Sequence, residues 1–125
     1  MPDESLTALI VCDDDDTLIR LREYLTRAGV EARATRRLSD AWGERASGAV
    51  VLMPDDFDMG EVTDCLRRLL SRVPAPLVIV VTAAPSRFEP LVRRFGAPNS
   101  VVVMPKPVWG WTILDLLRSR GGERD

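Results

Sequence analysis

The sequence predicts an α/β fold in which five parallel strands form one sheet between two layers of helices. Short apolar runs rich in valine and isoleucine alternate along the chain with stretches whose apolar residues recur at helical spacing. Continuous apolar runs are typical of strands buried on both faces of a parallel sheet. Right-handed crossovers between such strands place helices on both faces. The expected strands are residues 9–12, 30–34, 49–53, 77–81 and 101–104.

The run at 30–34 differs from the other predicted strands because apolar and charged residues alternate along it. Val30, Ala32 and Ala34 share one side, and Glu31 and Arg33 share the other. Such alternation suits a strand at the edge of a sheet, where one face or margin meets water.

Five amphipathic stretches supply the helices. The first, at 18–28, carries a leucine stripe and stops at Gly29, a residue type that favours helix C-termini. Ser39 can cap a short second helix at 39–42. The other helices are expected at 62–70, at 88–95 with Gly96 as its end, and at about 109–119, and residues 119–125 are expected to form a flexible tail or the stump of a linker.

Length and composition fit one domain over residues 1–125, with a core of about 6–118. The net charge of −2 gives no general attraction for nucleic acid. No apolar run approaches the roughly 18 residues of a membrane span. The chain has no histidine, which excludes histidine-based catalysis and disfavours zinc. Cys12 and Cys65 both stand in apolar patterns, so we expect free buried thiols and a cytoplasmic protein.

Four consecutive aspartates, Asp13 to Asp16, follow the first expected strand and precede the first expected helix. Such a run repels itself unless it is solvated, lies at the positive end of a helix dipole or holds a cation. The simpler interpretation is a helix cap, in which Asp14, Asp15 or Asp16 accepts hydrogen bonds from free backbone N–H groups. The alternative is a cation site.

Two further polar residues follow expected strands. Thr82 comes after the fourth strand and Lys106 after the fifth. Taken singly, Thr82 is a turn hydroxyl and Lys106 a solvated loop lysine. In doubly wound sheets, however, ligands bind beyond the carboxyl ends of the strands, where these two residues and the aspartates are expected to converge.

In these residues the chain resembles the receiver domain of two-component response regulators, the CheY-like superfamily. The resemblance is carried by residues 10–14, Thr82-Ala83 and Lys106-Pro107. It implies a flavodoxin-like fold with strand order 2-1-3-4-5 and a site where an aspartate accepts a phosphoryl group from a histidine kinase. It also implies that an acidic pair including Asp13 holds Mg²⁺, that the Thr82 hydroxyl meets the phosphoryl oxygens, and that Lys106 pairs with the phosphoryl group.

The chain departs from this family where the phosphoryl group would be accepted. The acceptor position falls on Met53 if strand lengths match, or on Leu52 if Gly60 is the anchor. Neither side chain can form an acyl phosphate. Cys12 stands where the family has its first acid, so any Mg²⁺ is expected to bind weakly, through Asp13 and Asp14.

A third departure is Val103, where the family usually carries an aromatic that moves on activation. Valine is small and stiff at χ1, so a rotamer switch there would displace little volume. We therefore expect a pseudo-receiver: a signalling domain, not an enzyme, that needs no cofactor and acts through protein contacts without phosphorylation.

Two alternatives stay open. A working phosphorelay receiver could use a displaced acceptor, Asp55 or Asp56, although the simpler interpretation of both is a surface loop carboxylate. A small α/β enzyme or nucleotide binder is the other alternative, against which the chain has no glycine-rich phosphate loop and no serine elbow.

The expected partner is a protein: an output domain, a kinase or a second copy of the chain. Trp109 and Trp111 flank Gly110, and exposed tryptophans are enriched at interface hot spots. The resemblance implies contact through the face made by the fourth helix, fifth strand and fifth helix. The contact candidates are Phe88, Arg93, Trp109 and Trp111, and neither nucleic acid nor membrane is expected as a partner.

Overall fold

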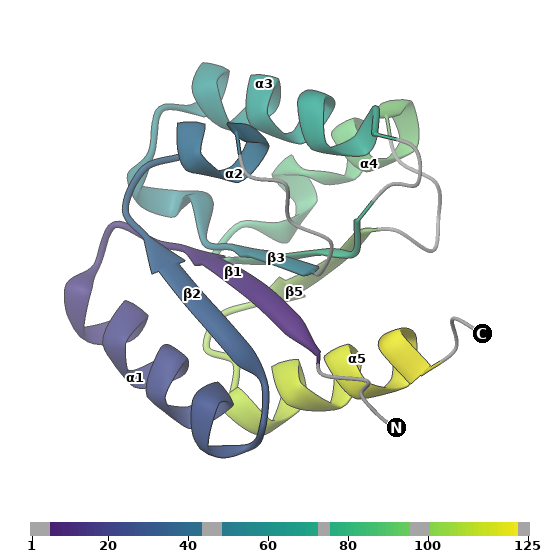
Figure 1. Ribbon diagram of the computed structural model, residues 1–125. Coiled ribbons are helices and arrows are strands. Elements are labelled where there is room, and N and C mark those ends of the chain that lie inside the picture. The colour runs from purple at the N-terminus through teal and green to yellow at the C-terminus, as the bar shows by residue number, and fades with distance from the viewer. Residues whose placement is uncertain (1–5, 44–48, 73–75, 96–100, 123–125) are drawn as a thin grey trace.

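The computed structural model describes residues 6–43, 49–72, 76–95 and 101–122, and these form a five-stranded parallel sheet with helices on both faces (Figure 1). The strands lie in the order β2-β1-β3-β4-β5, which confirms the predicted fold class and strand order. All four neighbouring pairs are parallel. The strands are β1 (Thr7–Val11), β2 (Glu31–Thr35), β3 (Ala49–Leu52), β4 (Val78–Thr82) and β5 (Val101–Pro105).

The helices form two layers. Helices α1 and α5 lie against one face of the sheet, and α2, α3 and α4 lie against the other (Figure 1). Two short 3₁₀ turns, η1 and η2, follow β3 and β4. The helices are α1 (Asp15–Arg27), α2 (Ser39–Gly43), α3 (Met59–Leu70), α4 (Glu89–Phe95) and α5 (Gly110–Gly122), and the turns are η1 (Pro54–Asp56) and η2 (Pro85–Arg87).

The core divides into two clusters because successive strand residues point to opposite faces of the sheet. Along β1, Ile10 packs with residues of α1 and α5, whereas Leu9 and Val11 pack with residues of α2 and α3. Both sides of the central strands are therefore covered by apolar side chains, which explains why their sequences are continuously apolar.

The two edge strands differ from their central neighbours. β2 begins at Glu31 and has the expected alternation of burial. β5 was expected to be buried on both faces, and this expectation is wrong: Val102, Val103 and Met104 are only half-buried. The reason is the strand order, which leaves β5 at the margin of the sheet with a neighbour on one side.

Side chains and backbone at three helix ends show how these helices begin or stop. Asp14 caps α1 by accepting a hydrogen bond from the amide of Thr17 at 3.2 Å, which supports the cap interpretation of the acidic run. Asp58 caps α3 in the same way through the amide of Glu61. α5 continues to Gly122, so residues 119–122 are helical, contrary to the expected tail. The predicted helix end at Gly96 lies outside the described residues.

Gly29 is needed for the turn from α1 into β2, because its φ is +94°. Residues with a side chain pay roughly 1–2 kcal/mol to adopt such a conformation. We expect Gly29→Ala to lower the free energy of unfolding by about 1 kcal/mol, measured by urea denaturation. Gly29→Asn should lower the free energy of unfolding by less, since asparagine adopts positive φ values more readily than alanine. An alanine variant as stable as the wild type would contradict this role.

Both cysteines are buried free thiols, as expected. Burial raises the pKa of Cys65 to about 12, so this thiol is unreactive at neutral pH. Within the part of the chain that the structure describes, no helix is both long enough and apolar enough to cross a membrane.

Candidate functional site

The polar residues predicted from the sequence meet at the carboxyl edge of the sheet. Main-chain hydrogen bonds extend the sheet into this edge: the Met53 amide donates to the Val11 carbonyl at 2.9 Å, and the Lys106 amide donates to the Thr82 carbonyl at 3.0 Å. The residues that leave β3, β4 and β5 are therefore held in fixed positions relative to one another.

Asp55 lies at the centre of this edge and binds three donors. The Thr82 hydroxyl donates to Oδ1 of Asp55 at 2.5 Å. The Ala83 amide donates to Oδ2 at 2.9 Å, and the Lys106 ammonium lies 3.3 Å from the same oxygen. The simpler interpretation of Asp55, a surface loop carboxylate without partners, therefore does not hold. Asp56 is exposed, as that interpretation expects.

The local sequence explains how Asp55 reaches this position. Pro54 has no backbone N–H and cannot continue the ladder of β3. The chain instead forms the 3₁₀ turn η1, closed by a hydrogen bond from the Phe57 amide to the Pro54 carbonyl at 3.0 Å. This turn lies against β4 and brings the Asp55 side chain to the end of that strand.

Burial and hydrogen bonding act in opposite directions on Asp55. Partial burial alone would raise its pKa. The hydrogen bonds from Thr82 and Ala83, together with Lys106, outweigh burial, so the pKa of Asp55 lies below its ordinary value. Although the residue as a whole is exposed, only 28% of its side chain is accessible. Asp55 is therefore an ionised ligand of these donors at neutral pH.

Thr82 links this contact to the following loop. The residue is fully buried, and its hydroxyl donates to Asp55 while accepting a hydrogen bond from the Ala84 amide at 3.1 Å. The buried hydroxyl thus has both a hydrogen-bond acceptor and a hydrogen-bond donor within the chain.

Arg36, which follows β2, neutralises part of the acidic run. Its guanidinium lies 3.3 Å from Oδ1 of Asp13 and 3.4 Å from the Asp15 carboxylate. Because β2 neighbours β1, residues that leave these two strands meet at the same edge. Sequence reasoning missed this pair, and the signal that could have found it is a basic residue directly after the strand expected beside β1.

Cys12 and Met53 follow β1 and β3 directly, and each has sulfur rather than oxygen in its side chain. Both are buried and belong to the core cluster under α1 and α5. Met53 is only 6% exposed, and Leu52, the other possible acceptor position, is fully buried. Burial also raises the pKa of the Cys12 thiol, so its neutral form is favoured.

The two carboxylates expected to bind Mg²⁺, Asp13 and Asp14, already have partners within the chain. Mg²⁺ requires nearly octahedral oxygen ligands, but Asp13 is paired with Arg36, and Asp14 accepts hydrogen bonds from Thr17. Hydrogen bonds from the Thr17 hydroxyl and amide lower the pKa of Asp14. Among the described residues, no group of three or more metal-ligating side chains is placed to hold an ion.

The predicted contact residues separate into one core residue and several surface residues. Phe88 is only 2% exposed and packs in the cluster under α2, α3 and α4, so its assignment as a contact residue is wrong. A phenylalanine at the junction of η2 and α4 completes that cluster instead of facing solvent. Arg93 is exposed and lies 3.8 Å from Glu89, and Val103 is half-buried at the edge.

Trp109 and Trp111 are both exposed, with 63% and 54% of their surface accessible. Their rings stack with centroids 4.9 Å apart and an angle of 6° between the planes. Gly110 between them lies against α1, since a Cβ there would be 2.9 Å from the Tyr24 ring. The two indoles thus form a continuous, exposed aromatic surface where α5 begins.

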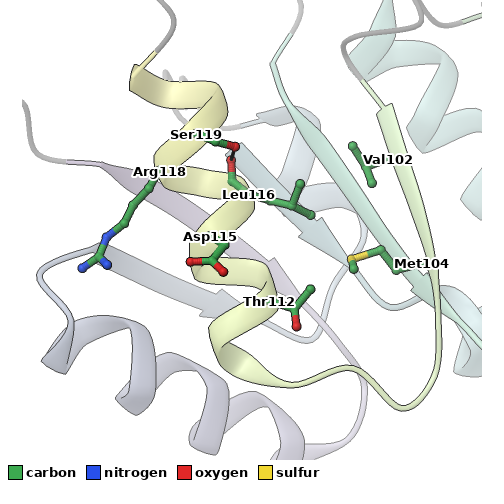
Figure 2. A pocket seen from close by; sticks show the side chains of 7 residues that line it. All are labelled: Val102, Met104, Thr112, Asp115, Leu116, Arg118 and Ser119. Atoms are coloured by element: carbon green, nitrogen blue, oxygen red, sulfur yellow. Dashed lines mark hydrogen bonds between the residues drawn. The ribbon is translucent and has the colours of Figure 1, made fainter.

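A groove of about 590 Å³ lies between α5 and the edge strand β5 (Figure 2). None of the residues that line the groove contacts Asp55, so the groove is separate from the polar contacts at the carboxyl edge of the sheet. Its walls are mainly apolar, from Val102, Met104 and Leu116, with Thr112, Asp115, Arg118 and Ser119 along α5.

No protein-family model and no curated protein matches the sequence. Solved structures do match. A CheY-like receiver domain from Methanospirillum hungatei JF-1 superposes with a TM-score of 0.81 and 21% identity, over 96% of both chains. A response regulator receiver protein from Sinorhizobium medicae WSM419 gives 0.78 and 17%, over 98% of both chains.

A third similar structure is the receiver domain of the sensor histidine kinase PA1611 from Pseudomonas aeruginosa PAO1, which has a magnesium ion coordinated in its active-site cleft. Its TM-score is 0.74 at 16% identity, over 96% of this chain and 100% of that domain. Over its described residues, therefore, this chain has the fold of the receiver domains of two-component response regulators.

Proposed function

We propose that this protein is a receiver-like signalling domain that acts through protein contacts without being phosphorylated. The observation that carries the proposal is that Leu52 and Met53, the two positions where the resemblance implies an acceptor aspartate, are both buried and apolar. A thioether that is 6% exposed supplies no nucleophilic oxygen. Such a domain transmits a signal by docking and catalyses no reaction of its own.

The polar contacts at this edge of the sheet support the same conclusion. The Thr82 hydroxyl, the Ala83 amide and the Lys106 ammonium already contact Asp55, so an incoming phosphoryl group would have to compete with this carboxylate for them. Asp13 is paired with Arg36, and any binding of Mg²⁺ is expected to be weak.

One alternative has specific support. A working receiver with a displaced acceptor needs a carboxylate within reach of both Thr82 and Lys106, and Asp55 meets this requirement. Against it, the donors contact the carboxylate oxygens themselves. An acyl phosphate on Asp55 would place its phosphoryl oxygens beyond these oxygens, so the donors would have to move. Asp56, which is exposed, has no comparable support.

Incubation with acetyl phosphate and Mg²⁺, followed by intact mass measurement, tests the proposal. We expect no added mass, because phosphoryl transfer needs an ionised carboxylate in line with the donor and a metal that neutralises charge. Asp55→Asn and Asp56→Asn serve as matched controls. Stoichiometric phosphorylation that is lost in Asp55→Asn would instead establish the displaced-acceptor receiver.

The proposed partner surface is the face formed by α4, β5 and α5. Exposed aromatic residues are typical of interface hot spots, and the stacked Trp109 and Trp111 lie at the start of α5. The apolar groove between β5 and α5 (Figure 2) adds contact area to the same face. Arg93 on α4 is exposed and is the charged contact candidate.

A further inference from the structure

The donor set around Asp55 has the chemistry of an anion site. One hydroxyl, one backbone N–H and one ammonium converge on a single carboxylate, at 2.5, 2.9 and 3.3 Å. Charge-assisted donors of this kind are the ligands that oxyanions prefer in proteins. The donors come from Thr82, Ala83 and Lys106, at or just after the ends of two neighbouring strands, so pairing of β4 with β5 keeps the backbone that carries them together whether or not an anion is present.

We propose that Asp55 is a tethered anionic ligand, which occupies this donor set and prevents free oxyanions such as phosphate from binding there. The inference rests on the proposed function and deepens it, since a site filled by the chain's own carboxylate has no need of a phosphoryl group. The depressed pKa of Asp55 is consistent with an ionised ligand at neutral pH.

The tether gives Asp55 an advantage over any free anion. η1 begins with the buried Pro54, and its position beside β4 holds the carboxylate next to its donors. An intramolecular ligand competes at an effective concentration that is commonly millimolar or higher. A free phosphate must in addition give up translational and rotational freedom to bind.

The contact also fixes the loop that follows β4. The Thr82 hydroxyl accepts from the Ala84 amide while it donates to Asp55, and η2 and α4 follow directly. Occupation of the donor set therefore holds the connection between β4 and α4 in one arrangement. The carboxylate thus acts on the same segment that leads to the proposed partner surface.

Amide chemical shifts of Ala83 and Ala84, measured by two-dimensional ¹⁵N NMR on the whole chain, test the tether. The variants are Asp55→Ala, Asp55→Asn and, as a matched control for an adjacent carboxylate, Asp56→Ala. Each is titrated with inorganic phosphate at neutral pH and constant ionic strength, with chloride as the control anion. Asp55→Asn keeps the side-chain volume and serves if the alanine variant does not fold.

We expect Asp55→Ala to move both amide resonances and Asp56→Ala to leave them in place. Phosphate should bind saturably to Asp55→Ala, with the Ala83 amide moving back toward its wild-type position. The wild type and Asp56→Ala should bind phosphate at least about tenfold more weakly. The phosphate affinity of Asp55→Asn should lie between those of Asp55→Ala and the wild type, because the asparagine amide can occupy the site but carries no charge.

The tether is refuted if wild type binds phosphate as tightly as the Asp55 variants, or if neither Asp55 variant binds it. It is also refuted if removal of the carboxylate leaves the Ala83 amide unchanged. These results are separable from the proposed function. If the wild type gains no mass with acetyl phosphate but the NMR results contradict the tether, only the tether is refuted. A stoichiometric acyl phosphate on the wild type would instead overturn the proposed function.

Discussion

Replacement of Phe88 by alanine is expected to lower the free energy of unfolding by about 3–5 kcal/mol, the usual range for a phenylalanine removed from a core. Phe88 is 2% exposed and packs among the residues under α2, α3 and α4. The cavity left by the ring would lie at the junction of η2 and α4, and the cost of such a cavity adds to the lost burial of the ring. Urea denaturation followed by circular dichroism measures the loss.

Trp109→Ala and Trp111→Ala are the matched aromatic variants on the surface. Both rings are more than half exposed, so their removal gives up mainly the contact between the two rings. The expected loss is about 1 kcal/mol or less. If Phe88→Ala were as mild as these variants, the assignment of Phe88 to the core would be wrong and its role as a surface contact would be restored.

Thr82→Val is expected to lower the free energy of unfolding by about 2 kcal/mol at pH 7, in the range for a hydrogen bond to a charged group. Valine has nearly the shape of threonine but cannot donate to Asp55 at this fully buried position. The loss stays in the lower part of that range because the Asp55 side chain is 28% exposed and can turn toward water.

The effect of Thr82→Val should depend on pH. The pKa of Asp55 is lower in the folded protein than the ordinary value of an aspartate, so its ionised form stabilises the fold. This contribution is complete above the unfolded-state pKa and disappears as the pH falls through the lower folded-state pKa. The difference between Thr82→Val and wild type should therefore be full at pH of about 5 and above, and shrink below about 4.

Thr63→Val provides the control for this pH dependence. The Thr63 hydroxyl donates to the Met59 carbonyl at 2.9 Å, a neutral acceptor that does not titrate. Its loss of stability should be the same at pH 7 and at low pH. A pH-independent loss in Thr82→Val as well would show that the Asp55 carboxylate is not the partner whose ionisation stabilises the fold.

The architecture could be predicted because apolar patterning determines it. Continuous apolar runs in β1, β3 and β4 require cover on both faces, and that requirement gives the three layers and the parallel sheet. Caps were predictable for a similar reason, because Asp14 and Asp58 precede helical patterns and their short side chains reach free amides. The burial of the edge strands was less predictable. The sequence of β5 is typical of a strand buried on both faces, although β5 lies at the edge of the sheet.

The candidate site was only partly predictable because it depends on the path of a loop. Thr82 ends β4 and Lys106 directly follows β5, so the sheet brings the backbone of the two residues together. Asp55 reaches them through a 3₁₀ turn that starts at Pro54, and the hydrophobic pattern carries no information about where such a turn points. The pairing of Arg36 with Asp13 likewise depends on strand adjacency that appears only when β2 lies beside β1.

The stacked indoles of Trp109 and Trp111 have a practical consequence. They are two of the three tryptophans in the chain, and both rings face water. Indole emission moves to shorter wavelength when water leaves its surroundings. Binding of a protein that covers these rings would therefore shift their fluorescence emission to shorter wavelength. The chain therefore carries an intrinsic optical probe at the place where we expect a partner, and no dye needs to be attached.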